Sequence, residues 1–243
     1  MSERLCVVIP VYNEEAAIGC VLEKWAARLE ALGIDFAIRA YDDGSRDGSL
    51  ARMREVAKSR GRIEALTKPN GGHGHTILTG YRAAASDGFD WVFQVDSDDE
   101  MEPDGFAALW ARRTECDFLV GRRDGRRQAL PRKVVSGVSR LAVCCLYGRG
   151  VWDVNSPYRL MRTSAFAKFF AAIPLSTFAP NVILSGLAAR TGLRCFEIPV
   201  PQHDRRTGEV SIRKWRLFKA AVRSLCQTVA FRFGKGACFN GGR

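Results

Sequence analysis

The segment from Asp90 to Glu102 reads D-W-V-F-Q-V-D-S-D-D-E-M-E, and it carries the clearest information about the fold. An apolar run, Trp91–Val95, ends abruptly in Asp96, Asp98 and Asp99. Strands that are buried on both faces of a parallel sheet look like this run, and open α/β sheets bind ligands beyond the carboxyl ends of their strands. Two Asp separated by one residue can both turn toward one divalent cation. The segment predicts a cation and phosphate site; the alternative is a solvated acidic turn.

Strand and helix signals alternate through residues 1–120, which predicts an α/β fold with a mostly parallel sheet and helices on both faces. Asn13 is the expected N-cap of the first helix. The expected strands are Leu5–Val11, Phe36–Tyr41, Arg62–Thr67, Trp91–Val95 and Asp117–Val120, and the expected helices are Glu14–Leu32, Asp47–Arg60, Gly74–Ser86 and Pro103–Arg113.

The second half of the chain has a less regular pattern. We expect a basic loop at Gly121–Arg127, helices at Pro131–Tyr147, Ser164–Ala172, Pro180–Thr191 and Ile212–Phe231, extended chain at Ser156–Met161, a strand at Arg194–Val200, and a loop at Gln202–Ser211. The resulting division is an α/β domain (1–211), a C-terminal amphipathic helix (212–233) and a tail without fixed structure (234–243).

Charge is distributed unevenly along the chain. Residues 1–120 hold 14 Lys and Arg against 21 Asp and Glu, whereas residues 121–243 hold 23 against 5. The acidic half suits a cation, and the basic half suits phosphates, nucleic acid or an anionic membrane surface. Nucleic-acid binding also predicts aromatic residues among the arginines, and residues 121–150 offer little beyond Tyr147. We therefore expect no nucleic-acid partner.

Neither a secretory leader nor an apolar run long enough to cross a bilayer is visible. The eight cysteines form no C-x-x-C pair, so they read as reduced thiols rather than a disulfide framework or a zinc site. The expected location is the cytoplasm, with peripheral attachment at the inner face of the membrane as an open alternative.

Polar clusters follow three predicted strands, and in a parallel sheet these strand ends share one edge. The clusters are Tyr12-Asn13-Glu14, Asp42-Asp43-Gly44-Ser45 and Asp96-Ser97-Asp98. Such an acidic rim repels itself unless something positive lies in it. Between them, Asn70–Gly74 reads N-G-G-H-G and leads into a helix, so that backbone amides and the helix start can approach an anion. An ordinary glycine-rich turn is the alternative.

Four motifs, in this order and spacing, resemble family 2 glycosyltransferases: V-I-P-V-Y-N-E (Val8–Glu14), D-D-G-S-R-D-G-S (Asp42–Ser49), N-G-G-H-G (Asn70–Gly74) and V-D-S-D (Val95–Asp98). The chain looks like the branch that contains dolichol-phosphate mannose synthase and other polyprenyl-phosphate glycosyltransferases. This resemblance implies the GT-A fold, a Rossmann-like nucleotide-binding sheet.

The resemblance also implies roles for particular residues. Pro10, Tyr12 and Glu14 would line the nucleotide pocket, Asp42 and Asp43 would contact the base and ribose, Gly72, His73 and Gly74 would lie near the substrate, and Asp96 and Asp98 would hold Mg²⁺ or Mn²⁺ on the diphosphate. Gln94 stands where the family often has an apolar residue or Met. Asp99 and Glu100 make the acidic cluster denser than usual, so Asp99 is a candidate third ligand.

Basic residues of the second half match phosphate-binding segments of the family. Arg122 and Arg123 follow a strand end, and H-D-R-R-T-G-E-V-S resembles the family's H-x-x-R-x-x-G-x-S segment, one residue out of register. Arg205, Arg206 and Ser211 would then contact the diphosphate or an acceptor phosphate, with Arg206 as a catalytic candidate, because the guanidinium fork binds phosphate oxygens in pairs. For any one of these arginines, the alternative is a solvated surface charge.

Asp153 lies in D-V-N-S-P-Y-R, which is similar to the family's D-x-x-S-G-[FY]-[RK] segment with Pro157 in place of glycine. The resemblance makes Asp153 a candidate general base, which a hydroxyl acceptor needs and an anionic phosphate acceptor does not.

The last predicted helix carries Trp215, Phe218, Val222, Leu225 and Val229 on one stripe. Such a stripe usually packs on its own domain, and a membrane interface is the alternative.

The sequence as a whole predicts a metal-dependent, inverting glycosyltransferase that uses a UDP- or GDP-linked sugar and a polyprenyl-phosphate acceptor. A carbohydrate hydroxyl acceptor, as in cell-surface glycan synthesis, is one alternative. A catalytically silent binder of nucleotide-sugars or lipid phosphates is another, and the intact Asp96 and Asp98 argue against it.

Overall fold

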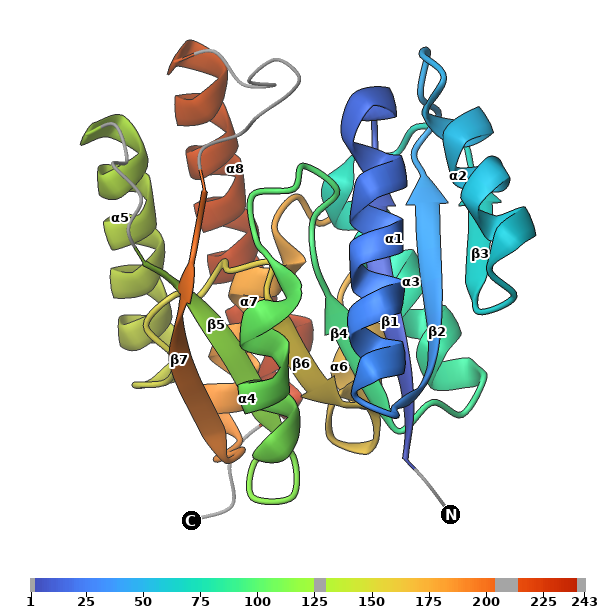
Figure 1. Cartoon of the computed structure of the whole chain (residues 1–243). Coiled ribbons are helices and arrows are strands. Elements are labelled where there is room, and N and C mark those ends of the chain that lie inside the picture. The colour runs from blue at the N-terminus through green and yellow to red at the C-terminus, as the bar shows by residue number, and fades with distance from the viewer. Residues whose placement is uncertain (1–2, 125–129, 204–213, 240–243) are drawn as a thin grey trace.

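The computed structural model describes residues 3–124, 130–203 and 214–239. Within these ranges one sheet is formed by β1 (Arg4–Val11), β2 (Asp35–Asp42), β3 (Ile63–Thr67), β4 (Trp91–Gln94), β5 (Phe118–Asp124), β6 (Arg159–Arg162) and β7 (Cys195–Pro201). The strand order is β3-β2-β1-β4-β6-β5-β7. β6 is antiparallel to both β4 and β5, and the other neighbouring pairs are parallel. The prediction of a mostly parallel sheet is confirmed (Figure 1).

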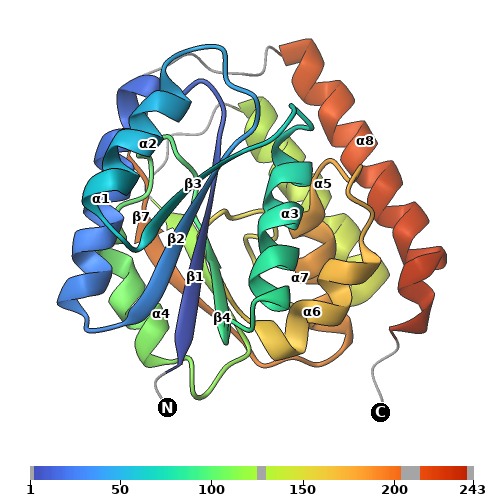
Figure 2. The same ribbon diagram turned by 90° about the vertical axis from the view of Figure 1, so that its right-hand side faces the viewer.

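Helices cover both faces of this sheet (Figures 1 and 2). One face carries α1 (Glu15–Ala31), α2 (Ser49–Ser59) and α4 (Phe106–Ala111). The other face carries α3 (His73–Ser86), α5 (Leu130–Tyr147), α6 (Thr163–Ala172), α7 (Pro180–Arg190) and α8 (Lys214–Phe233). No helix in the described part of the chain is both long and apolar enough to span a bilayer.

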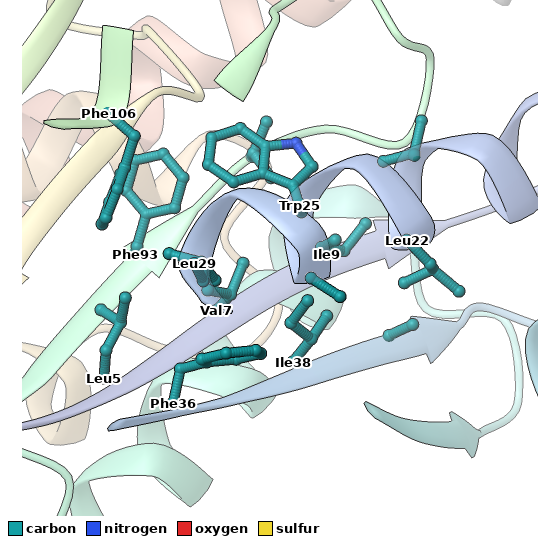
Figure 3. Packing of buried hydrophobic residues seen from close by; sticks show 14 of the residues in the cluster. Leu5, Val7, Ile9, Leu22, Trp25, Leu29, Phe36, Ile38, Phe93 and Phe106 are labelled. Atoms are coloured by element: carbon teal, nitrogen blue, oxygen red, sulfur yellow. The ribbon is translucent and has the colours of Figure 1, made fainter. Parts of the chain in front are cut away.

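The central strand β1 supplies both cores because successive side chains of a strand point to opposite faces. Leu5, Val7 and Ile9 pack under α1, whereas Cys6 and Val8 pack under α3 and α6. On the α1 face, a fully buried aromatic cluster surrounds Trp25, with ring centroids 5.1 Å from Phe93 and 5.9 Å from Phe106 (Figure 3). Replacing such a buried Trp by Ala costs about 3–5 kcal/mol, so this cluster fixes α1 on the sheet and holds the ends of β1 and β4 in place.

Several predicted boundaries differ from the structure. Asn13 is not the N-cap of α1: its φ is 54°, and its Oδ1 accepts a hydrogen bond from the Arg46 amide at 2.9 Å. Residues 121–124 belong to β5 rather than to a loop, because β5 continues its pairing with β7 as far as Asp124. The helix expected from Pro103 begins as a 3₁₀ turn (Pro103–Gly105) before α4. In the expected tail, the Phe239 ring packs 5.1 Å from that of Phe169.

Helix α8 turns Ser224, Thr228 and Phe231 toward the domain, which contradicts the expected orientation of its apolar stripe. Ser224 and Thr228 are buried, and Thr228 O accepts a hydrogen bond from Tyr147 Oη at 2.9 Å. Val222 and Val229 are 44% and 37% exposed. The side chains of Trp215 and Phe218 lie outside the described part of the structure. The outer face of α8 therefore carries apolar side chains together with the exposed Lys219 and Arg223.

Candidate active site

A cavity of about 390 Å³ lies at the carboxyl ends of β1, β2, β3 and β4, where the sequence predicts it. Its lining residues come from all three acidic motifs and from the glycine-rich segment: Pro10, Val11, Tyr12, Glu14, Asp43, Asn70, Gly72, His73, Thr76, Asp96, Ser97 and Asp98. We call it the donor cavity after the role that we propose for it. Four segments far apart in the sequence meet there because the parallel strands end at one edge of the sheet.

Asp43 holds the glycine-rich segment rather than standing free in the cavity. Its carboxylate accepts hydrogen bonds from the amides of Gly71 at 2.9 Å and Gly72 at 2.8 Å, and it also pairs with the Lys68 ammonium group. Burial alone would raise the pKa of Asp43, but the bonds from Lys68 and Gly71 outweigh burial and hold this pKa below its usual value. Gly72 has a φ of 86°, a conformation that glycine adopts without strain. Asp43 thus fixes the backbone of Gly71 and Gly72, which directly precede α3.

Asp42 is turned into the protein. It is 2% exposed, and its carboxylate accepts hydrogen bonds from Thr67 Oγ1 at 2.9 Å and from the Ser45 amide at 3.1 Å. Among the described residues that line the donor cavity, Asp43 appears and Asp42 does not. The structure therefore gives Asp42 a role in shaping the turn after β2, and of the two aspartates only Asp43 lines this cavity.

Asp96 lies at the floor of the cavity, within reach of His73 in the first turn of α3. The distance from His73 Nε2 to Asp96 Oδ1 is 3.1 Å, and Gln94 Nε2 donates to the same oxygen at 3.0 Å. Burial works against the charge on both partners, but their mutual attraction raises the pKa of His73 and lowers that of Asp96. The sequence placed both residues near the substrate, and the structure adds that they contact each other.

Asp98 lines the donor cavity, and Asp99 does not. The backbone of Asp99 has a φ of 57°, which turns its carboxylate toward α1, where Lys24 Nζ lies 2.9 Å from Oδ2. Asp99 is therefore an ion-pair partner of Lys24 and not a third metal ligand. In the described residues no three His, Cys, Asp or Glu side chains form a ready-made metal cluster.

The residues present nevertheless fit a hard divalent cation. Asp96 and Asp98 offer carboxylate oxygens from one strand end, and Mg²⁺ is usually held by one or two carboxylates together with water and substrate phosphates. The donor cavity leaves room beside them for those other ligands.

A second cavity of about 410 Å³ adjoins the first, and we call it the acceptor cavity after the role that we propose for it. It shares Gly72, His73 and Asp96 with the donor cavity. Its remaining lining residues come mainly from the second half of the chain: Arg123, Asn155, Pro157, Ser176, Thr177, Phe178, Ala179, Pro180, Asn181 and Arg223, together with Gly71, Gly74, His75 and Ile77. Gly74 allows α3 to lie close to the loop that contains Thr177 and Phe178, because a Cβ on Gly74 would overlap the backbone carbonyls of these two residues.

Arg123 is the arginine that β5 presents to the acceptor cavity. Asp153 grips it with two parallel bonds, Nε to Oδ2 at 2.7 Å and Nη2 to Oδ1 at 2.8 Å. Burial would lower the pKa of Arg123, but the bonds and charge of Asp153 raise it. Glu197 on β7 in turn accepts from the amides of Trp152 and Asp153, both at 2.8 Å. Asp153 is thus a partner of Arg123 and is itself held in place.

Arg122, which the sequence placed at the substrate, points elsewhere. It is exposed and lines neither cavity, because neighbouring side chains of a strand alternate between faces. The sequence pointed to both arginines at this strand end, and the structure places only Arg123 at a cavity. No local sequence pattern indicated that Arg223, Phe178 and Asn181 line this cavity. Arg205, Arg206 and Ser211 lie outside the described residues.

A model of the glycosyl transferase family 2 matches residues 6–170. The chain belongs to this family. Its sheet and helices have the GT-A fold, as the resemblance of the sequence motifs implied.

Curated relatives point to one branch of the family. The undecaprenyl-phosphate 4-deoxy-4-formamido-L-arabinose transferase of Pseudomonas paraeruginosa is 33% identical over 214 residues, which are 87% of this chain and 61% of that protein. The enzyme of the same name from an Enterobacter species is 29% identical over 217 residues, 88% of this chain and 64% of its own. The chain thus spans about three fifths of the length of these relatives.

Solved structures show the same fold at low sequence identity. Glucosyl-3-phosphoglycerate synthase from Mycobacterium tuberculosis, in complex with Mn²⁺, UDP and phosphoglyceric acid, superimposes with a TM-score of 0.68 at 19% identity, covering 96% of this chain and 79% of that one. Mannosyl-3-phosphoglycerate synthase from Rubrobacter xylanophilus gives 0.69 at 14% identity, covering 97% and 75%.

Proposed function

We propose that this protein transfers a sugar from a UDP- or GDP-linked donor to the phosphate of a polyprenyl phosphate, with inversion at the anomeric carbon. The donor would lie in the donor cavity, with its diphosphate near Asp96 and Asp98. A divalent cation, Mg²⁺ or Mn²⁺, held by these carboxylates would offset the charge that develops on the departing nucleoside diphosphate. The curated relatives, which are named as undecaprenyl-phosphate transferases, support this acceptor class.

The acceptor cavity suits an anionic group. Arg123 and Arg223 line it, and Arg123 is fixed in position by Asp153. A guanidinium that is already oriented loses little freedom when it binds phosphate oxygens. The two cavities meet at His73 and Asp96, so an acceptor phosphate and a donor sugar would face each other across this junction. Direct attack from that side displaces the diphosphate and inverts the anomeric carbon.

The observation that carries the proposal is the pairing of Asp153 with Arg123. A hydroxyl acceptor needs a base that can take its proton, but both carboxylate oxygens of Asp153 accept hydrogen bonds from a guanidinium. A phosphate acceptor is already anionic and needs no base. The carboxylate of Asp153, which could have served as a base for a sugar hydroxyl, therefore orients Arg123 instead. This favours the phosphate acceptor.

Turnover with two acceptors tests this assignment. Polyprenyl phosphate and a free oligosaccharide are each supplied with nucleotide-sugars and Mn²⁺, using the native protein and Asp153→Asn. We expect transfer to the lipid phosphate, with Asp153→Asn raising the acceptor KM while the shape of the pH profile is kept. Transfer to the oligosaccharide alone, with kcat of Asp153→Asn lowered by roughly 10²–10⁴-fold as for loss of a general base, would refute it.

We also propose that α5 and α8 bring the acceptor cavity to an anionic membrane surface, at the cytoplasmic side where nucleotide-sugars are found. The two helices contact each other, and α8 runs along the outside of the molecule (Figure 2). Val222, Val229 and Phe233 of α8 are 44%, 37% and 70% exposed, and Leu141 of α5 is 65% exposed. The segments 130–147 and 214–233 contain no Asp or Glu. Apolar side chains among basic ones suit an anionic lipid interface.

Vesicle co-sedimentation tests the membrane proposal. The full chain is mixed with vesicles of phosphatidylcholine alone or with added phosphatidylglycerol, and Val229→Asp is compared with Ala27→Asp, a matched charge at an exposed position of α1 on the other face of the sheet. We expect binding to the anionic vesicles that Val229→Asp weakens and Ala27→Asp keeps. Equal binding by both variants, or no binding by the native chain, would contradict the proposal.

A further inference from the structure

A buried chain of polar side chains lies beneath the junction of the two cavities. Gln94, the last residue of β4, is fully buried, as are Tyr81 on α3 and Asn181 in the first turn of α7. Tyr81 Oη lies 2.7 Å from Gln94 Oε1 and 3.1 Å from Asn181 Oδ1, and Asn181 Nδ2 donates to Gln94 Oε1 at 2.7 Å. Three elements that are far apart in the sequence therefore converge on one amide.

This arrangement leaves Gln94 a single orientation. Its Oε1 accepts from Asn181 Nδ2, so a flipped amide would set its NH₂ group against the Asn181 NH₂ group and its oxygen against the Asp96 carboxylate. Burying a donor without a partner costs about 1–3 kcal/mol. The amide is thereby locked with Nε2 directed at Asp96, where it donates to Oδ1 at 3.0 Å.

The chain also connects the two cavities. Asp96 lines both of them, and Asn181 lines the acceptor cavity. The backbone carbonyl of Asn181 accepts a hydrogen bond at 3.1 Å from Arg159, which is itself fully buried and also donates to the carbonyls of Val154 and Ser156. Asn181, in the wall of the acceptor cavity, is therefore connected to Asp96 by the hydrogen bonds of Gln94.

Apolar side chains in place of the whole network could also fill this part of the core, because a buried polar network is not needed for stability. Fully satisfied networks instead fix one geometry, and side chains that hydrogen-bond to metal ligands orient them. We infer that Gln94 is a positioning residue that holds the Asp96 carboxylate in the orientation required for cation binding and links it to Asn181 on the acceptor side. This inference rests on the proposed function, which places the cation at Asp96.

Direct measurement of Mn²⁺ binding tests the inference without turnover. Free Mn²⁺ is followed by electron paramagnetic resonance during titration of the full chain in the presence of UDP or GDP. Gln94→Met keeps the approximate size and removes every hydrogen bond of the amide, so we expect the Mn²⁺ dissociation constant to rise about tenfold or more, the usual effect of losing such a bond. Tyr81→Phe keeps the hydrogen bond from Gln94 to Asp96 and removes the contact of the Tyr81 hydroxyl with Gln94. We expect a smaller rise of the Mn²⁺ dissociation constant in this variant.

A matched control separates positioning from general damage to the core. Ser185→Ala removes a buried hydroxyl of α7 that donates to the Val154 carbonyl at 2.8 Å and has no bond to Gln94. We expect its Mn²⁺ affinity to equal that of the native chain. The double variant Tyr81→Phe with Gln94→Met should bind Mn²⁺ no more weakly than Gln94→Met alone, because Tyr81 acts through Gln94.

The outcomes distinguish this inference from the proposed function. Native binding of Mn²⁺ that Asp96→Asn abolishes and Gln94→Met leaves within twofold would overturn the role of Gln94 and leave the proposed function standing. Equal weakening by Gln94→Met and Ser185→Ala would also overturn it, since the effect would then be a general loss of packing. Mn²⁺ binding that is indifferent to Asp96→Asn would instead overturn the proposed function.

Discussion

The donor and acceptor cavities are built in different ways, although they share His73 and Asp96. The donor cavity is lined by motifs that directly follow parallel strands, so backbone topology alone brings its residues together. The acceptor cavity is lined largely by single side chains from β5, from the loops near Asn155 and Phe178, and from α7 and α8. The first is acidic and suits a cation with its diphosphate, whereas the second presents arginines. The reaction centre that we propose is thus divided by charge, as the two halves of the chain are.

The largest effect is expected on the donor side. Asp98→Asn removes one of two carboxylates that the cation would share, and a bound cation supplies several kcal/mol of charge stabilisation. We expect kcat/KM to fall by roughly 10³-fold and stabilisation of the fold by Mn²⁺ with nucleotide to disappear. Turnover and melting temperature with and without Mn²⁺ measure both. Asp99→Asn serves as the matched control, since Asp99 pairs with Lys24; an equal loss there would contradict the division of roles.

A smaller effect is expected on the acceptor side. Arg123→Gln removes the charge that we propose as a partner of the acceptor phosphate, and such a charged hydrogen bond is worth about 1.5–3 kcal/mol. The acceptor KM should therefore rise about 10- to 100-fold, with the donor KM unchanged. Arg122→Gln, one residue away on the exposed side of β5, should leave both constants as they are. Steady-state kinetics with each substrate varied gives the answer, and a shift in donor KM alone would place Arg123 on the wrong side of the site.

How far the sequence predicts this site depends on how its residues are brought together. The donor cavity could be predicted because strand ends in a parallel sheet must meet. The direction in which each carboxylate turns could not, because Asp42 is directed by Thr67 and Ser45, and Asp99 by Lys24. The acceptor cavity depends on contacts between distant residues, such as Gln94 with Asn181, and no local pattern encodes them.

The orientation of helix α8 also could not be predicted from the sequence. Its apolar spacing predicts a buried stripe, yet Ser224 and Thr228 face the domain, and Val222 and Val229 face outward. Amphipathic spacing identifies that a helix has two faces but does not say which neighbour each face will meet. Contacts of Tyr147, Gln227 and Phe231 hold α8 on the domain. None of these three residues belongs to the apolar stripe that the sequence shows.

The close approach between α3 and the loop that follows α6 is open to a test of stability. In Gly74→Ala the new Cβ would overlap two backbone carbonyls, which cannot move aside as a flexible side chain would. We expect the free energy of unfolding to fall by about 1–3 kcal/mol. Gly137→Ala on α5 meets no atom within 4 Å and should be neutral or slightly stabilising. Denaturant unfolding of both variants checks this, and equal stabilities would mean that the contact is not tight.

The smallest effect concerns pH and the glycine-rich segment. The pKa of Asp43 is lower in the folded chain than its usual value, so its bonds stabilise the fold fully above the unfolded pKa of about 3.9. This contribution is lost as the pH falls through the lower, folded pKa. We expect unfolding free energies of the native chain and Asp43→Asn to differ most at neutral pH and to converge below about pH 4. A difference that grows in acid would contradict the ion pair with Lys68.

The central claim is that Asp96 and Asp98 bind a divalent cation that carries the diphosphate of a sugar donor. Anomalous scattering from Mn²⁺, in crystals grown with a nucleoside diphosphate, tests it most directly. We predict one strong peak in the donor cavity, within bonding distance of both carboxylates and of diphosphate oxygens. A nucleotide bound in that cavity with no Mn²⁺ peak at Asp96 and Asp98, or a peak elsewhere, would contradict it.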